Sequence, residues 1–244
     1  MTTVRFGLNS NCDYTGDWVD NSLNSTNTRE NNNYGISDNV QFGADIPLTF
    51  LRTGLFYWDL SDLDPIIGDS TSELVISSAT LKIYIPTIGD SGTIITRRML
   101  VEWLAGSKDG ATAGANESCW NYRVYDSTAW NTVGARGGAD CDRVNDVTIS
   151  GIISSTGWKD LDVTGIVRRQ FDDDTYYGVG IYPIGIGGWY RQSNHATAAE
   201  RPYLEIVLAE ASGEYANDVN GVAAAYIAKV NGVAAANIAK VNGV

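Results

Sequence analysis

Apolar and polar residues alternate in short runs over most of the first 209 positions, which is the pattern of half-buried β-strands. In the clearest run, Leu81, Ile83 and Ile85 fall on one face of the strand, and charged or aromatic residues fall on the other. Clusters of Gly, Asn, Ser and Asp separate the runs and favour turns. The predicted strands are 4–8, 53–60, 79–86, 94–103, 147–154, 157–163, 177–184 and 202–209.

A single short helix is predicted at 164–171, where three apolar residues recur at helical spacing. Asp162 or Thr164 is the expected N-cap, because either side chain can accept a hydrogen bond from an amide of the first turn. Two long segments, 9–39 and 104–145, lack periodicity and are expected to form loops. Many short strands, Gly-rich turns and almost no helix predict an all-β fold, specifically a β-sandwich over residues 1–209.

The last 26 residues repeat with a period of 11, because Val-Asn-Gly-Val begins at Val219, Val230 and Val241. Asn-Gly between apolar residues is the strongest short-range hairpin signal, so Lys-Val should enter each turn and Val-Ala should leave it. A helical interpretation competes, since eleven residues make about three helical turns, although each Gly disfavours a continuous helix. Short helical or extended pieces punctuated by Asn-Gly are therefore expected.

The repeat has two full copies and a stub, whereas about three or more stacked units are usually needed for stability. After a linker at 210–218, the tail at 219–244 is thus either a flexible tail or an element completed by another chain. In the second case it serves docking or oligomerisation, with a trimer as the working guess. The predicted assembly residues are Val219, Asn220, Gly221, Val222, Tyr226, Ile227, Val230, Asn231, Gly232, Val233, Ile238 and Val241.

Charge and hydropathy argue against some classes of binding partner. A formal net charge of −12 argues against nucleic-acid binding, which needs a basic surface. No run of 18 apolar residues is present, so membrane insertion is not expected. The N-terminus lacks the basic and apolar regions of a signal peptide, which indicates a protein used without signal-dependent secretion, or a processed form.

The three cysteines, Cys12, Cys119 and Cys141, are too few for a disulfide scaffold. Reduced, partly buried thiols are expected, and pairing of Cys119 with Cys141 across one loop is the alternative.

Catalytic chemistry has few candidates. The single histidine, His195, lies in a polar segment expected to be a surface loop, and no Gly-x-Ser-x-Gly elbow is present. The adjacent acids 172–174 could form a glycosidase carboxylate cluster, but they are more typical of a solvated turn. We therefore expect a protein that is not an enzyme.

Metal and cofactor signals are also few, and no cofactor is expected. Asp140, Asp142 and Asp146 are candidate Ca²⁺ ligands, although their spacing does not fit an EF-hand. No Cys/His pattern suits zinc.

Aromatic residues are the more serious binding candidates, because flat rings beside Asn, Asp and Arg suit a sugar-binding surface. The glycan candidates are Trp120, Tyr122 and Tyr125 in the long loop, and Trp189 and Tyr190 in a Gly-rich turn. The competing interpretation is that Trp103, Trp130 and Trp158 fill the core and anchor the long loop. Core or loop anchoring is favoured for the Trp-rich loop, whereas exposure and ligand contact are equally weighted for Trp189 and Tyr190.

Four segments in order carry a family resemblance. They are 52–61 (Arg-Thr-Gly-Leu-Phe-Tyr-Trp-Asp-Leu-Ser), 76–84 (Ile-Ser-Ser-Ala-Thr-Leu-Lys-Ile-Tyr), the Trp-rich segments at 101–103, 119–121 and 128–132, and a closing segment at 191–193 with 201–205. Together they resemble the DNRLRE family of extracellular and virion β-sandwich domains, which is related to carbohydrate-binding modules. Trp58 stands where that family usually has Phe. The resemblance implies a jelly-roll sandwich.

The tail is similar to segments at the ends of tailed-phage structural proteins. The two resemblances together imply a structural virion protein, such as a capsid decoration, a head fibre or a tail-associated component. It would display a carbohydrate-binding-like sandwich on the virion surface and would contact copies of itself, other virion proteins and glycans of a host or of the environment. The alternative is a free-standing or cell-surface carbohydrate-binding module, extracellular and without catalysis.

Overall fold

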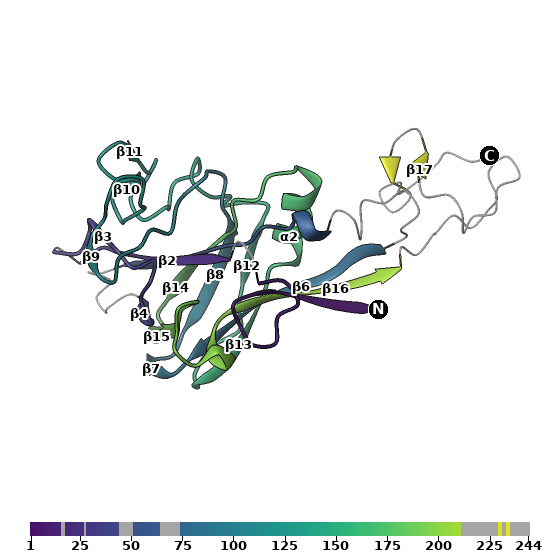
Figure 1. Ribbon diagram of the computed structural model, residues 1–244, viewed down its shortest axis with the longest axis horizontal. Coiled ribbons are helices and arrows are strands. Elements are labelled where there is room, and N and C mark those ends of the chain that lie inside the picture. The colour runs from purple at the N-terminus through teal and green to yellow at the C-terminus, as the bar shows by residue number, and fades with distance from the viewer. Residues whose placement is uncertain are drawn as a thin grey trace, which may run out of the picture.

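Two antiparallel sheets packed face to face form the domain (Figure 1). The computed structural model describes residues 1–15, 18–26, 28–43, 51–63 and 74–210, and the strand residues 229–230 and 233–234. The first sheet has the order β1 (Thr2–Gly7), β16 (Tyr203–Glu210), β6 (Leu74–Ile85), β13 (Gly157–Asp162). The second has the order β12 (Val147–Ile149), β8 (Thr93–Arg98), β14 (Val179–Ile184), β5 (Arg52–Tyr57), β2 (Val19–Asn24). The predicted all-β sandwich is therefore confirmed.

The chain crosses between the two sheets at nearly every step. From β5 onward, successive long strands β5, β6, β8, β13, β14 and β16 alternate between the second and the first sheet. This is the winding of a jelly roll, and it places the first strand, β1, beside β16, the last strand of the sandwich. The predicted alternation in β6 is confirmed, because Leu81, Ile83 and Ile85 are all buried between the sheets.

A third, smaller sheet closes one side of the sandwich. Its order is β4 (Asn39–Gly43), β15 (Gly187–Arg191), β7 (Thr87–Asp90). Val40, Phe42 and Tyr190 point from it into the core that the two large sheets share. β7 continues the line of β6 after a bend at Pro86, so the third sheet is attached to the first through one bent strand.

The long segment at 104–145 forms a third layer over the outer face of the second sheet. Its indoles Trp120 and Trp130, with Trp103 just before it, form a second core with Leu55 and Tyr182 from that sheet. The favoured interpretation, loop anchoring, is confirmed for these three tryptophans. The segment holds only short strands: β9 (Ala111–Thr112), which pairs with β3 (Asn32–Asn33), and β10 (Tyr122–Val124), which pairs with β11 (Thr128–Ala129).

Trp158 differs from that expectation, because it lies on the outer face of the first sheet with 37% of its surface exposed. It follows Gly157 at the start of β13, and Leu161 is the β13 residue that points into the core. The core-filling interpretation of Trp158 is wrong.

The predicted helix at 164–171 is confirmed and extends one residue further, but its N-cap differs from the prediction. α2 (Thr164–Asp172) buries Ile166 and Val167. Val163 occupies the N-cap position without a side-chain cap, so neither predicted N-cap is correct. Asp162 Oδ1 instead accepts the Thr164 amide at 2.9 Å, just ahead of the helix. Two 3₁₀ turns complete the set, η1 (Ser61–Leu63) and η2 (Ala198–Glu200).

Two segments predicted to be irregular contain strands. The expected loop at 9–39 holds β2, and the expected Gly-rich turn holds β15. β2 is hard to predict because its polar residues are buried beneath the third layer, where Asn21 Nδ2 donates to Ser118 Oγ at 2.8 Å.

One copy of the tail repeat contains the predicted hairpin. β17 (Lys229–Val230) pairs antiparallel with β18 (Val233–Ala234), which leaves residues 231–232 as a two-residue connection. The other predicted assembly residues of the tail lie outside the described residues. β16 reaches Glu210, one residue beyond the predicted end of the sandwich.

Two further properties bear on the sequence predictions. The cysteines are free, and Cys119 and Cys141 are buried, so reduced thiols are confirmed and the alternative pairing is not formed. Within the described part of the chain, no helix has the length and apolarity needed to cross a membrane.

Candidate functional site

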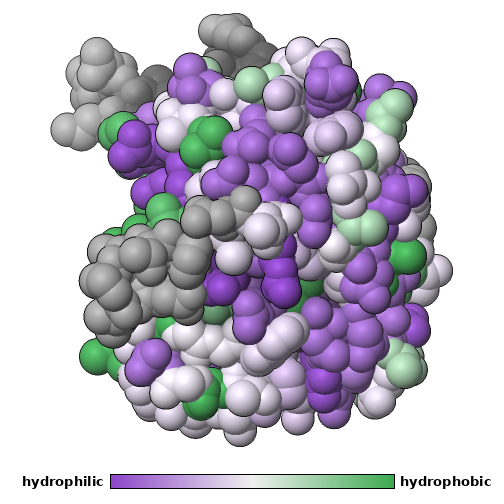
Figure 2. Space-filling model, turned by 90° about the vertical axis from the view of Figure 1, so that its left-hand side faces the viewer, coloured by the Kyte–Doolittle hydropathy of each residue, from purple (hydrophilic) through white to green (hydrophobic). Residues whose placement is uncertain are grey.

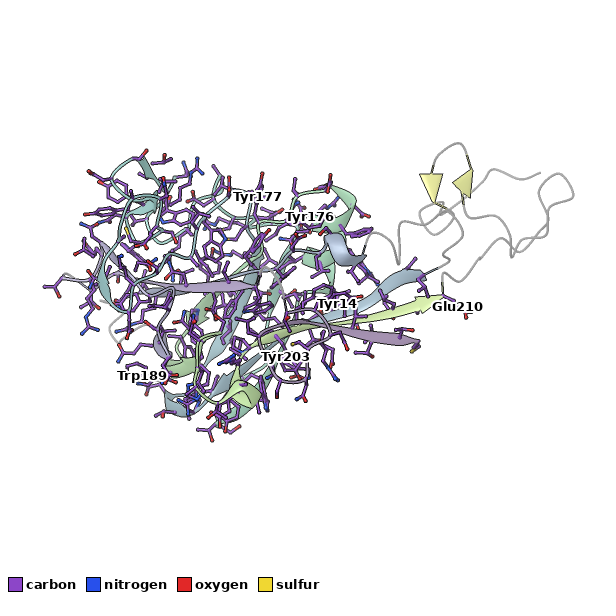
Figure 3. All side chains as sticks on the ribbon, in the orientation of Figure 1. Tyr14, Tyr176, Tyr177, Trp189, Tyr203 and Glu210 are labelled. Carbon is purple, nitrogen blue, oxygen red and sulfur yellow. The ribbon has the colours of Figure 1, made fainter. Side chains whose placement is uncertain are left out.

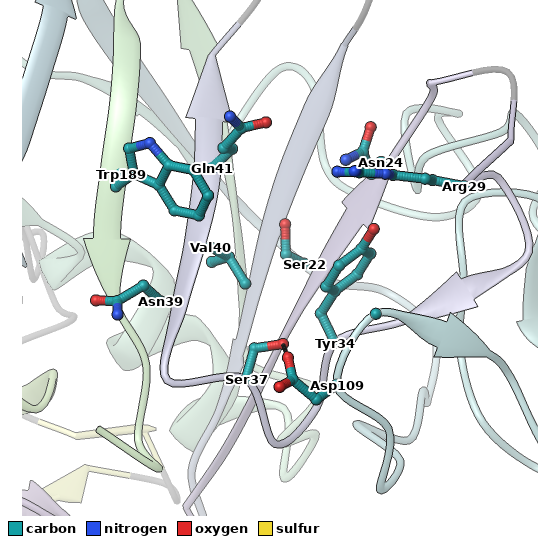
Figure 4. Close-up of a pocket in the computed structure, with 11 residues that line it drawn as sticks. Ser22, Asn24, Arg29, Tyr34, Ser37, Asn39, Val40, Gln41, Asp109 and Trp189 are labelled. Atoms are coloured by element: carbon teal, nitrogen blue, oxygen red, sulfur yellow. Dashed lines mark hydrogen bonds between the residues drawn. The ribbon is translucent and has the colours of Figure 1, made fainter. Parts of the chain in front are cut away.

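A hollow of about 270 Å³ lies between the third sheet and the edge of the second (Figure 4). Ser22 from β2 and Val40 from β4 line its buried part. Trp189 and Gln41 stand on one side, and Arg29 stands on the other beside Asn24. We call this first hollow the groove. Its lining residues come from β2, β4, β15 and the connections between strands.

Trp189 reaches the groove because of strand alternation. In β15 it pairs with Gln41 of β4 and Thr87 of β7, and it is 39% exposed. Tyr190, the next residue, points to the opposite face and is 0% exposed. Gly188 permits the close approach of β15 to β7, since a Cβ there would lie 2.3 Å from the Thr87 carbonyl oxygen. Trp189 is therefore available to a ligand, whereas the candidate Tyr190 is a core residue.

Some polar groups of the groove already accept hydrogen bonds within the protein, whereas others have donors available to a ligand. Ser37 donates to Asp109 Oδ1 at 2.6 Å on the far wall. Asn24 Oδ1 accepts from the Thr26 amide and hydroxyl, which leaves its amide N–H groups turned to the hollow side. Arg29 is exposed, and no residue in the described ranges forms an ion pair with it. Planar donors and acceptors beside an exposed indole are what a hydroxyl-rich ring can use.

A second hollow of about 480 Å³ continues on the other side of the indole. It is lined by Asn39, Pro86, Thr87, Trp189 and Arg191, so Asn39 and Trp189 belong to both hollows. The surface at this end of the molecule is largely hydrophilic, with hydrophobic residues scattered singly (Figure 2). Trp189 presents an exposed ring to both hollows, and the Tyr34 ring also lines the first one (Figure 4).

Ion pairs and hydrogen bonds hold the rim of the second hollow. Arg191 Nε donates to Glu200 Oε2 at 2.9 Å, and its Nη1 donates to Asn39 Oδ1. His195 lies between two carboxylates, with Nδ1 2.6 Å from Asp38 Oδ1 and Nε2 3.4 Å from Glu200 Oε2. The expected surface position of His195 is wrong, because the residue is buried. Its ring links Asp38, in the turn before β4, to Glu200 of η2.

The charge state of Asp38 supports this arrangement. Partial burial opposes ionisation of its carboxyl group, but hydrogen bonds from the Ala196 amide and from His195 outweigh burial and lower its pKa. An ionised Asp38 thus tethers the segment after β15 to the start of β4.

Asp20 lies beneath the groove in β2 and is fully buried. Its carboxylate accepts the Ser193 amide at 2.9 Å and the Ser193 hydroxyl at 2.8 Å. Burial raises its pKa to about 7, and these hydrogen bonds only partly offset that effect. Asp20 lines neither hollow, but β2 therefore carries, two residues before Ser22, a group that titrates near neutral pH.

The aromatic candidates of the long loop do not join Trp189. Trp120 is 5% exposed and packs beneath the Arg136 guanidinium, so it is a core residue and not a glycan platform. Tyr122 and Tyr125 are half-buried and pack edge to face at 5.7 Å in the β10–β11 ribbon. That ribbon lies on the other side of β2 from β15 (Figure 1).

The calcium candidates are each occupied by other partners. Asp140 accepts backbone amides from Asn131, Thr132 and Gly137 at 2.8–3.0 Å. Asp142 accepts two turn amides, and Asp146 pairs with Arg98 at 2.8 Å. Across the described ranges, no three His, Cys, Asp or Glu side chains gather to hold a metal ion. Within the described residues, the three candidate Ca²⁺ ligands therefore do not converge on one site.

No protein-family model matches this chain, and no curated protein is significantly similar to it.

The sequence predicts Trp189 as a site residue but gives no prediction for the residues beside it in the groove. Asn39 and Gln41 alternate with the buried Val40 and Phe42, which is a strand signal. This signal begins where the predicted loop at 9–39 ends. Arg29 carries no comparable signal, because only the tertiary fold brings it opposite β15.

Proposed function

We propose that this domain is a non-catalytic carbohydrate-binding β-sandwich whose ligand stacks on Trp189. The single observation that supports the proposal is the exposed indole of Trp189 in a polar groove on a rigid strand. One face of a pyranose ring presents C–H groups that can pack on an indole, and its rim presents hydroxyls for Gln41, Asn24 and Arg29. A site of this kind needs no preceding conformational change, because strand pairing already orients the ring.

The test is binding of soluble oligosaccharides to the full chain and to two variants. The probes are the hexaoses of cellulose, xylan, mannan and starch, titrated by isothermal calorimetry. At least one should bind, and Trp189→Ala should weaken its binding at least tenfold. Tyr122→Ala is the matched control, because it removes a half-buried aromatic outside the groove, and it should bind like the parent. Absence of binding to all four probes, or equal affinity in Trp189→Ala, would contradict the proposal.

A second proposed role concerns the tail. We propose that the sandwich is displayed on a virion surface and assembles through the repeat at 219–244. The supporting observation is a two-residue hairpin in one repeat copy, since an isolated hairpin is marginally stable and gains by pairing with other strands. Removal of residues 219–244 should convert an oligomer into a monomer that keeps the thermal unfolding transition of the sandwich. Light scattering after size-exclusion chromatography measures this, and an unchanged oligomer would rule the role out. A free-standing carbohydrate-binding module then remains the alternative.

A further inference from the structure

A second aromatic surface lies on the outer face of the first sheet. Trp158 packs edge to face against Tyr84 on one side and Tyr203 on the other, with ring centroids 5.4 Å apart in both pairs. Trp158 remains 37% exposed although it is the largest side chain on that face. The two tyrosines hold the indole in one orientation, so its free surface is as fixed as that of Trp189.

Core packing does not explain the position of the Tyr84–Trp158–Tyr203 cluster. Along β6, β13 and β16 the alternate residues Leu81, Leu161 and Leu204 face inward and form the core, whereas the cluster points outward. Charged pairs border it on the same face. Lys82 Nζ lies 3.0 Å from Asp160 Oδ2, and Arg5 Nε lies 2.8 Å from Glu205 Oε2. These charges are mutually satisfied, so the aromatic cluster is the part of the face left to contact a ligand.

The cluster is continuous with the groove through the bent strand. Tyr84 is two residues before Pro86, and Pro86 lines the second hollow beside Trp189. Thr87, which pairs with Trp189, is three residues beyond Tyr84, or roughly 10 Å along a strand. The two indoles are therefore carried by strands paired to one bent segment, Trp158 beside Tyr84 and Trp189 beside Thr87, with Pro86 between these two pairing positions.

We infer that the ligand is a linear oligosaccharide whose chain occupies both platforms, with one sugar on Trp189 and a later sugar on the Tyr84–Trp158–Tyr203 cluster. This inference rests on the proposed carbohydrate function and adds the length of the ligand. A single terminal sugar would use Trp189 and leave the cluster without a role in binding. A longer chain passes over Pro86 and gains a second stacking contact. Because both contacts involve one ligand molecule, the affinity should depend on the length of the oligosaccharide chain.

The test compares ligand lengths with the full chain. The probes are the disaccharide and the hexaose of whichever of the four glycans above binds, titrated against the parent, Trp158→Ala and Trp158→Tyr. Trp158→Ala should weaken hexaose binding at least fivefold and leave disaccharide binding unchanged, and Trp158→Tyr should restore most of the hexaose affinity. An unchanged melting temperature shows that the exposed substitution leaves the fold intact.

The outcomes separate the two proposals. If Trp189→Ala abolishes binding while Trp158→Ala leaves the hexaose affinity unchanged, the two-platform inference is wrong. The proposed binding site at Trp189 is then still supported. The two-platform inference is also wrong if Trp158→Ala weakens the binding of both ligand lengths equally. If Trp189→Ala has no effect, or none of the four glycans binds, both proposals fall.

Discussion

β15 and the long third-layer segment both carry tryptophan close in sequence to Gly and Arg, yet they use it in opposite ways. In β15 the residues pair with β4 in unbroken register, so Trp189 and Tyr190 point to opposite faces, and Trp189 is the one that faces solvent. In the third layer, Trp120 and Trp130 both point toward the second sheet. Local composition does not distinguish these roles, whereas backbone regularity does.

The third layer needs its aromatics because it has little secondary structure of its own. Trp130 Nε1 donates to the Cys119 carbonyl at 2.8 Å, and Trp103 Nε1 donates to the Tyr177 carbonyl at 2.9 Å. Each indole therefore fills space and satisfies a backbone acceptor at once. β15 is held by main-chain pairing on both edges, which leaves its outward side chain available to a ligand.

The largest effect should come from removal of a third-layer anchor. Trp130→Ala should lower the free energy of unfolding by about 3–5 kcal/mol, because it opens a cavity and orphans a carbonyl. Urea unfolding followed by fluorescence measures this value. A loss below about 1 kcal/mol would mean that the segment does not depend on its indoles, and the contrast with β15 would fail.

A pH effect should follow on the groove side. Asp20 has a native pKa of about 7, far above its ordinary value of 3.8, so the folded state retains the proton longer than the unfolded state. The free energy of unfolding should therefore fall as pH rises from about 4 to 7, by roughly 2–4 kcal/mol, and then level off. Asp20→Asn should remove this component. Parallel pH profiles for the parent and the variant in urea titrations would contradict the assignment.

The corresponding carboxylate of the third layer should behave differently. Asp140 is buried and accepts three backbone amides, so its acceptor oxygens hold the surrounding loop together. Asp140→Asn should cost roughly 1–3 kcal/mol, since an amide group would then face the amides it now accepts. Asp126→Asn is the matched control, because Asp126 is exposed and Asn tolerates its positive φ of 56°. Equal stability of the two variants would overturn this prediction.

The smallest effect on stability should come from the groove itself. Trp189→Ala should change the free energy of unfolding by no more than about 0.5 kcal/mol, because Trp189 is exposed and belongs to neither core cluster of the described residues. Chemical denaturation beside Trp130→Ala gives the comparison directly. A loss above about 2 kcal/mol would identify Trp189 as a packing residue and would weaken its role as a platform.

The sequence predicted the parts of this fold that obey local rules. β6, β13, β16 and α2 carry clear periodicity, and each occurs within a few residues of its prediction. β2 was missed because Asp20, Asn21 and Ser22 are buried polar residues whose partners come from distant segments. β15 was missed because two glycines begin it, and glycine normally signals a turn.

The candidate site was less accessible to prediction than the fold. Trp189 could be named from its type and setting, but its exposure could not, since Tyr190 carries the same local signal. Arg29 reaches the groove only through long-range packing. A single sequence contains no local pattern for such a meeting of distant segments.

The placement of Trp189 and Glu210 at opposite ends of the described domain has a mechanical consequence (Figure 3). A pull between a ligand held at Trp189 and the chain leaving β16 at Glu210 would run nearly along the strands. β16 is hydrogen-bonded to β1 over six residue pairs and to β6 over eight. Because ladder hydrogen bonds lie across the strand direction, such a force shears both ladders at once and does not open them one bond at a time. Such strand pairing resists tension along the strands, which suits the proposed attachment through Trp189.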